Sequence, residues 1–204
     1  MIRAIIFDLD NCLSAADEPE KGLLEPVFDA IRQVNHGRLS DVAVAESFSD
    51  CWRQPLDFVA KKHGFAEDML AAGWAVSVRL EVAAPMRGYA DLHTLAELPV
   101  ARFLVTSGFR RLQESKIKAL GFERLFTAIY VDAIDEDGRK GKHSIFAGIL
   151  DAYRLKPEEV LVVGDNPDSE IEAGNRLGSR RCRSYGQVCL AATMQVITST
   201  TLLS

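Results

Sequence analysis

The chain has 204 residues, of which 48% are hydrophobic and 26% are charged, and its formal net charge at pH 7 is −5. This composition is typical of a folded globular protein, and the acidic balance argues against a nucleic-acid partner because it implies no strongly basic face. No window approaches the roughly 18–20 apolar residues of a membrane span, so we expect no membrane partner. The four cysteines have neither metal-ligand spacing nor the density of a disulfide framework, which favours a cytoplasmic location.

An apolar run at residues 4–7 (AIIF) leads directly into two carboxylates, Asp8 and Asp10. An unbroken apolar run of this length is typical of a strand that is buried on both faces in a parallel sheet. Side chains two residues apart on a strand share a face, so both carboxylates are expected in one site at the carboxyl end of the strand, where open α/β sheets bind ligands. Their mutual repulsion requires either a divalent cation or a proton held on one of them.

A helical pattern fills the chain from Leu23 to about Val82. Apolar residues recur there at helical spacing in four successive segments, and Ser40 is expected to be the N-cap of the second. The region shows no strand-like alternation. We therefore predict two domains, which are a helical cap domain at residues 17–83 and an α/β core domain at residues 1–16 and 84–204.

From residue 84 onward, predicted strands and helices alternate. The predicted strands are short apolar runs at residues 101–106, 127–131, 160–165 and 181–185. The predicted helices lie at residues 89–98, 112–121, 144–153 and 171–178. This alternation with short turns implies an α/β fold, with a Rossmann-like parallel sheet and helices on both of its faces. The tail at residues 186–204 shows no clear pattern.

Three of the predicted strands end in residues suited to a phosphate or metal site. Asp8 and Asp10 follow the first strand, Thr106 and Ser107 end the second, and Asp165 ends a later one. A crossover fold brings the carboxyl ends of parallel strands to one edge of the sheet. Residues far apart in the chain are therefore predicted to meet in one site.

The first two of these strand ends resemble motifs of a known family. Residues 7–13 (FDLDNCL) match the pattern D-x-D-x-T-L, except that Cys12 stands where threonine is usual. Residues 104–108 (LVTSG) match a second motif, in which a strand ends in Thr or Ser.

Two later segments extend the resemblance. Lys140 stands six residues before Phe146, where the pattern K-P-x-P-x-x-F places a lysine, although both prolines are missing. Residues 162–170 (VVGDNPDSE) match G-D-x-x-x-x-D, with Glu170 as the last acid. The chain therefore resembles the haloacid dehalogenase (HAD) superfamily, specifically its phosphatase branch with a helical cap inserted after the first motif.

The resemblance implies hydrolysis of a phosphomonoester through a covalent intermediate. Asp8 would attack phosphorus and form an aspartyl-phosphate, while Asp10 would protonate the leaving oxygen and then deprotonate the attacking water. Thr106 and the backbone amide of Ser107 would hold phosphate oxygens at the start of a helix. Lys140 would neutralise charge on the phosphoryl group.

The resemblance also implies a magnesium cofactor. Asp8, the backbone carbonyl of Asp10, Asp165 and the substrate phosphate would share the ion. Glu170 would orient a water on the metal, with Asp168 as its rival for that role. Because the helical cap would close over the site, a small phosphorylated metabolite is a better substrate than a protein.

The sequence leaves alternatives open. Lys142 is close enough to Lys140 to take its role. A phosphotransferase or mutase would use the same residues, with a sugar hydroxyl replacing water as the acceptor. A catalytically idle binding protein is supported only by the departures at Cys12, at the missing prolines and at Glu170. The identity of the substrate and the oligomeric state are likewise open.

Overall fold

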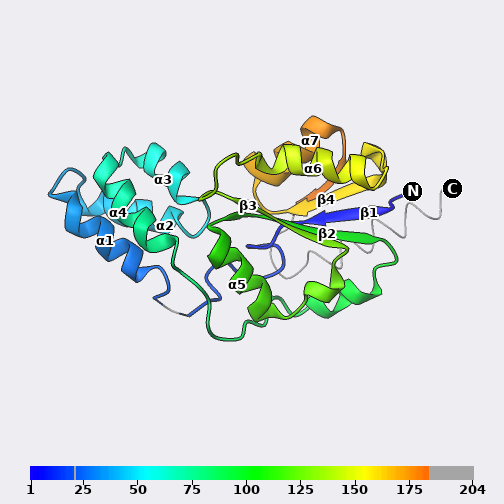
Figure 1. The fold of residues 1–204 in the computed structure, drawn as a ribbon, viewed down its shortest axis with the longest axis horizontal. Helices are drawn as coiled ribbons and strands as arrows, with labels where there is room; N and C mark the ends of the chain where they lie inside the picture. Colours follow the sequence, from blue (N-terminus) through cyan, green and yellow to red (C-terminus); the bar gives the residue numbers. More distant parts are fainter. Residues whose placement is uncertain (21, 184–204) are drawn as a thin grey trace.

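The computed structural model describes residues 1–20 and 22–183, and its centre is a five-stranded parallel sheet (Figure 1). The strands lie in the order β3-β2-β1-β4-β5, and each pairs in parallel with its neighbours. Their bounds are β1 (Ala4–Phe7), β2 (Ala101–Gly108), β3 (Ala128–Ala133), β4 (Val160–Gly164) and β5 (Arg180–Arg183). The predicted Rossmann-like α/β class is confirmed.

β1 is short and wholly buried because it lies in the middle of the sheet. Phe7 is paired with Leu104 of β2 on one side and with Val163 of β4 on the other. The strand order reverses at β1. The next two strands, β2 and β3, are added on one side of β1, and β4 and β5 are added on the other. Ligands bind outside the carboxyl ends of the strands at such a reversal point, so β1 and β4 together mark the place for a site.

Helices cover both faces of the sheet, with α5 on one face and α6 and α7 on the other (Figure 1). Their bounds are α5 (Arg110–Leu120), α6 (Gly141–Ala152) and α7 (Glu172–Leu177).

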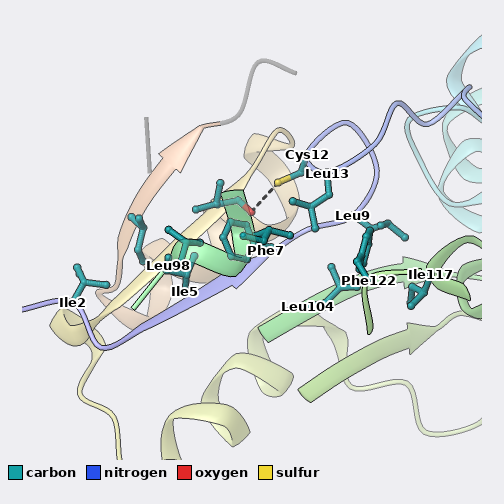
Figure 2. Packing of buried hydrophobic residues seen from close by; sticks show 13 residues of the cluster. Ile2, Ile5, Phe7, Leu9, Cys12, Leu13, Leu98, Leu104, Ile117 and Phe122 are labelled. Carbon is teal, nitrogen blue, oxygen red and sulfur yellow. Dashed lines mark hydrogen bonds between the residues drawn. The ribbon is translucent and has the colours of Figure 1, made fainter. Parts of the chain in front are cut away.

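Alternate residues of β1 serve the two faces. Ile5 and Phe7 join the apolar cluster that includes Ile117 of α5, whereas Ile6 joins the cluster that includes Phe146 of α6. This is the period of two that a strand imposes, applied to a strand without a solvent face. Figure 2 shows the first of these clusters, in which Leu9, Cys12 and Leu13 continue the packing beyond the end of β1.

Four helices inserted between β1 and β2 gather beyond the carboxyl ends of the strands (Figure 1). Their bounds are α1 (Glu25–Asn35), α2 (Asp41–Asp50), α3 (Leu56–His63) and α4 (Glu67–Ser77). Ser40 is the N-cap of α2, and its hydroxyl accepts a hydrogen bond from the amide of Ala43 at 3.3 Å, as predicted. The division into cap and core at residues 17 and 83 stays a prediction.

The inserted helices pack around an apolar cluster that extends to Leu112 of α5. The rings of Phe28 and Phe48 stack with centroids 4.2 Å apart, and Ile31 is fully buried. The edge of Trp74 meets Phe109 at the start of α5, with centroids 4.8 Å apart. The insert is therefore packed directly against the helix that follows β2.

Several predicted elements differ in extent or type. The helix expected at residues 89–98 is a 3-10 helix (Leu92–Glu97), and further 3-10 turns lie at Glu123–Leu125 and Pro157–Glu159. The helix expected from Ser144 begins at Gly141. A π-helical turn (Pro167–Ile171) precedes α7. The last two residues of the strand predicted at 181–185, and the tail at residues 186–204, lie outside the described residues.

Candidate active site

Asp8 and Asp10 lie where β1 gives way to a tight loop. The amide of Asp8 donates to the carbonyl of Val163 at 3.0 Å, so pairing with β4 continues one residue past the strand. Asn11 takes a left-handed conformation (φ 56°), which asparagine tolerates better than most residues, and its amide donates to Ser14 O at 2.7 Å. The chain thus turns away at once and leaves both carboxylates at the end of the sheet.

Cys12 fixes this loop to β4. Its side chain is buried, and Sγ lies 3.6 Å from the carbonyl oxygen of Val163, to which the thiol donates a hydrogen bond (Figure 2). A thiol is a weak donor, but it packs as a small apolar group. Cys12 can therefore take the place of the threonine in the D-x-D-x-T-L pattern, because it both packs in the interior and donates a hydrogen bond.

Lys142, and not Lys140, reaches Asp8. The Nζ of Lys142 lies 2.8 Å from Asp8 Oδ1 and 2.9 Å from Glu170 Oε2, and all three side chains are buried. Lys140 is exposed and does not line the site. The expectation for Lys140 is corrected here, because α6 begins at Gly141 and its first turn carries Lys142 inward.

Burial controls the charges of this group. Burial raises the pKa of Asp8 from its ordinary value to about 7, against the opposing effect of Lys142, while Glu170 adds to the rise. Burial alone would lower the pKa of Lys142, but the adjacent carboxylates of Asp8 and Glu170 raise it above its ordinary value. Burial, followed by the charge of Glu170, also raises the pKa of Asp165. Without a further cation, the charge of Lys142 balances only part of the negative charge of these three carboxylates.

Three carboxylates have the arrangement of a cation site. Oxygen atoms of Asp8, Asp165 and Glu170 all lie within 4.8 Å of one another. An oxygen-only donor set suits a hard divalent cation such as Mg²⁺, so these residues fit the group that the resemblance implies. Asp10 offers no side-chain oxygen to this cluster.

Glu170 and Asp168 have different surroundings. Glu170 is buried, and its Oε1 accepts a hydrogen bond from the amide of Asn166 at 2.6 Å. It folds back beneath Gly164 at the end of β4, where the Cβ of any other residue would collide with its side chain. Asp168 is exposed, and its amide donates to Asn166 Oδ1 at 3.0 Å. Of these two residues, only Glu170 belongs to the carboxylate cluster with Asp8 and Asp165.

Asp10 is held by two residues that the sequence did not single out. Lys116 Nζ lies 2.8 Å from its Oδ1, and Gln113 Nε2 lies 3.2 Å from its Oδ2. Both side chains come from α5, three positions apart and therefore on one face of the helix. The spacing of three places Gln113 and Lys116 on one face of a predicted helix, but no sequence pattern indicates that this face contacts Asp10.

Thr106 and Ser107 lie at the end of β2, as predicted, and both line the site. Ser107 Oγ donates to Asp132 Oδ2 at 3.0 Å, and Asp132 also accepts from Arg139 Nε at 3.0 Å. Arg139 Nη1 donates in turn to Asp57 Oδ2 of α3 at 3.2 Å. A continuous chain of polar contacts therefore runs from the end of β2 to the inserted helices.

The site opens into a cavity of about 300 Å³ between the strand ends and the insert. Its lining includes Asp8, Asp10 and Lys142 near the strand ends, together with Trp52 and Phe58 of the insert. A cavity of this size can bind a small molecule, which would contact side chains of both the strand ends and the inserted helices. Trp52 therefore lines the cavity, while Trp74 packs between the insert and Phe109.

The chain is similar to several known proteins. The chain is 26% identical over 194 residues to the glyceraldehyde 3-phosphate phosphatase of Methanopyrus kandleri, covering 87% of this chain and 82% of the relative. It is 25% identical over 201 residues to the N-acylneuraminate-9-phosphatase of Rattus norvegicus, covering 87% and 79% of the two chains. The putative HAD-hydrolase YfnB from Bacillus subtilis, solved bound to magnesium, shares the fold with a TM-score of 0.58 and 15% identity, over 89% of this chain and 86% of that one.

Among the described helices, none is long and apolar enough to cross a membrane. The profile of one family, described as haloacid dehalogenase-like hydrolase, matches residues 2–178. Since this match spans strands β1 to β4, the inserted helices and every residue of the carboxylate cluster, the chain belongs to the haloacid dehalogenase-like hydrolases.

Proposed function

We propose that this protein is a magnesium-dependent hydrolase of phosphomonoesters that works through an aspartyl-phosphate at Asp8. The observation that carries the proposal is the contact between Lys142 and Asp8, at 2.8 Å, in the lining of a cavity at the ends of β1, β2 and β4. A lysine placed there favours the ionised form of Asp8 that attacks and neutralises charge on an incoming phosphate. The names of the curated relatives support the same reaction.

The residues have distinct roles in the proposed reaction. An Asp8 oxygen attacks phosphorus as the bond to the leaving oxygen breaks, and Asp10 gives that oxygen its proton. A water then attacks the aspartyl-phosphate, Asp10 takes back a proton, and inorganic phosphate leaves with Asp8 restored. Thr106 and the amide of Ser107 hold the phosphate oxygens during both steps, together with Lys142.

Asp8, Asp165 and the backbone carbonyl of Asp10 would hold Mg²⁺, with Glu170 behind them. When bound, the ion offsets the repulsion between the anionic nucleophile and the anionic phosphate. Two observations support this assignment, namely the oxygen-only cluster and the magnesium-bound relative YfnB.

The cavity also bears on the substrate. Two buried acceptor atoms on the insert side, Gln54 Oε1 and Asp57 Oδ1, have no hydrogen-bond partner among the described residues. Buried acceptors without partners are unfavourable, and hydroxyl groups of a ligand would satisfy them once these side chains turn toward the cavity. A small phosphorylated metabolite whose leaving group carries hydroxyl groups therefore suits the cavity.

A direct test is the release of inorganic phosphate from a panel of small phosphomonoesters, with Mg²⁺ and with excess chelator. The proposal predicts release that requires Mg²⁺ and appears without an added acceptor, which separates hydrolysis from phosphoryl transfer to a sugar. Asp8→Asn should remove this activity while the protein stays folded in chelator. Full activity in chelator after removal of residual metal, or in the Asp8→Asn variant, would contradict the proposal.

A further inference from the structure

Each carboxylate oxygen of Asp10 accepts one hydrogen bond from α5 and keeps a second lone pair that can hold a proton. Lys116 Nζ lies 2.8 Å from Oδ1, and Gln113 Nε2 lies 3.2 Å from Oδ2. A carboxylate bound at both oxygens by two different side chains keeps one orientation at the edge of the site. Neither donor belongs to the motifs at the ends of the strands.

The burial of Lys116 is difficult to explain by packing alone. Its side chain is 7% exposed, and Asp10 is its one ion-pair partner among the described residues. Burying an ammonium group is costly unless it is paired, and an apolar side chain of similar length fills such a position without that cost. The lysine therefore makes sense at this position through what it does to Asp10.

Gln113 fixes the same group from a second direction. Its Nε2 donates to Asp10 Oδ2 and also to the carbonyl of Ser107 at 3.2 Å, so one amide connects the end of β1 with the end of β2. Both neighbours are acceptors, which determines the orientation of the amide. A Cβ at Gly108 would lie 2.5 Å from Nε2, so this close approach also requires glycine at that position.

We propose that Lys116 and Gln113 are positioning residues that hold Asp10 where it can give a proton to the leaving oxygen. This inference rests on the proposed phosphatase function. The inference predicts that loss of Lys116 lowers kcat/KM for substrates that need a proton on the leaving oxygen. It should change kcat/KM little for substrates that do not need one. A merely structural role for Lys116 would lower both rates together.

The test compares glycerol phosphate, whose alkoxide must be protonated, with 2,4-dinitrophenyl phosphate, whose phenolate leaves without a proton. We expect Lys116→Met to lower kcat/KM for glycerol phosphate at least about tenfold more than for the aryl ester, a fraction of the usual contribution of general acid catalysis. Lys116→Arg should restore most of the difference. Lys118→Met, an exposed lysine on the same helix, should leave the ratio of the two substrates unchanged.

Gln113→Leu provides a second variant in case Lys116→Met does not fold, with exposed Gln33→Leu as its control, and it should shift the substrate ratio in the same direction. Equal losses on both substrates in a folded variant of either residue would overturn the inference and leave the proposed function standing. Failure of the unaltered protein to hydrolyse either ester would overturn the proposed function, and the inference with it.

Discussion

The ammonium group of Lys142 lies 2.8 Å from Oδ1 of Asp8, although the two residues are 134 positions apart in the chain. The contact is possible because β1 lies beside β4 in the sheet and α6 starts near their carboxyl ends. It pairs the proposed nucleophile with a cation that opposes, without cancelling, the rise in the pKa of Asp8 that burial causes.

Lys142 should therefore matter far more than Lys140. We expect Lys142→Met to lower kcat/KM about 100-fold or more, the scale of losing one charged group that stabilises a transition state. Lys140→Met removes an exposed charge and should stay within about twofold of the unaltered protein. Steady-state kinetics on one substrate measures both. Equal losses in the two variants would contradict the assignment of Lys142.

Magnesium binding should depend on pH. Because burial raises the pKa of Asp8 to about 7, and raises that of Asp165, protons compete with the ion below neutrality. Titration with Mg²⁺ should show affinity that falls as the pH is lowered from about 8 to about 5, by up to about tenfold per unit for each proton displaced. Affinity that is constant over this range would contradict the site.

The stability of the metal-free protein should change in the opposite direction. The pKa of Asp8 is raised from 3.8 in the unfolded chain to about 7 in the folded one, so its contribution is fully present below 3.8 and is lost as the pH rises through about 7. Thermal unfolding in chelator should therefore show falling stability from about pH 5 to about pH 8. Added Mg²⁺ should reverse this trend at the upper end.

Cys12→Thr should be tolerated. A threonine hydroxyl can donate to the same carbonyl of Val163 that the thiol contacts at 3.6 Å, and its extra methyl group must be absorbed by the surrounding cluster. We expect the free energy of unfolding and the activation barrier each to change by no more than about 1–2 kcal/mol. Denaturant unfolding and kcat report the two quantities. A loss of activity beyond a hundredfold would show a role of the thiol that this packing does not explain.

Gln54 should help to select hydroxylated leaving groups. Its Oε1 would accept from a substrate hydroxyl once the amide turns toward the cavity, so Gln54→Leu should reduce the preference for glycerol phosphate over propyl phosphate by about two- to tenfold. Gln54→Glu keeps an acceptor at that atom and should keep the preference, and exposed Gln33→Leu serves as the control. An unchanged preference in Gln54→Leu would remove this residue from the substrate site.

Much of the fold could be predicted from the sequence because the signals were local. The apolar runs of β1 and β4 and the capping residue Ser40 each depend on near neighbours. The ends of elements were less reliable, as at α6, where a charged run continues to Gly141 and conceals the start of the helix. One turn of difference there decides whether Lys140 or Lys142 faces the site.

The site residues that directly follow strands could be predicted from the sequence. The residues that reach the site from a helix, such as Lys116 of α5, could not. Asp8 and Asp165 sit at strand ends, which parallel topology brings together. The contact of Lys116 with Asp10 spans 106 residues and depends on how α5 packs against the sheet. No local pattern distinguishes Lys116 from a solvated lysine on a polar helix.

The most direct measurement is chemical identification of the intermediate at Asp8. The protein is mixed with Mg²⁺ and a phosphomonoester, quenched within one turnover, reduced with borohydride and analysed by peptide mass spectrometry. The proposed function predicts conversion of Asp8 to homoserine, dependent on substrate and absent from the Asp8→Asn variant. Rapid turnover with Asp8 unmodified, or with the label on another residue, would contradict it.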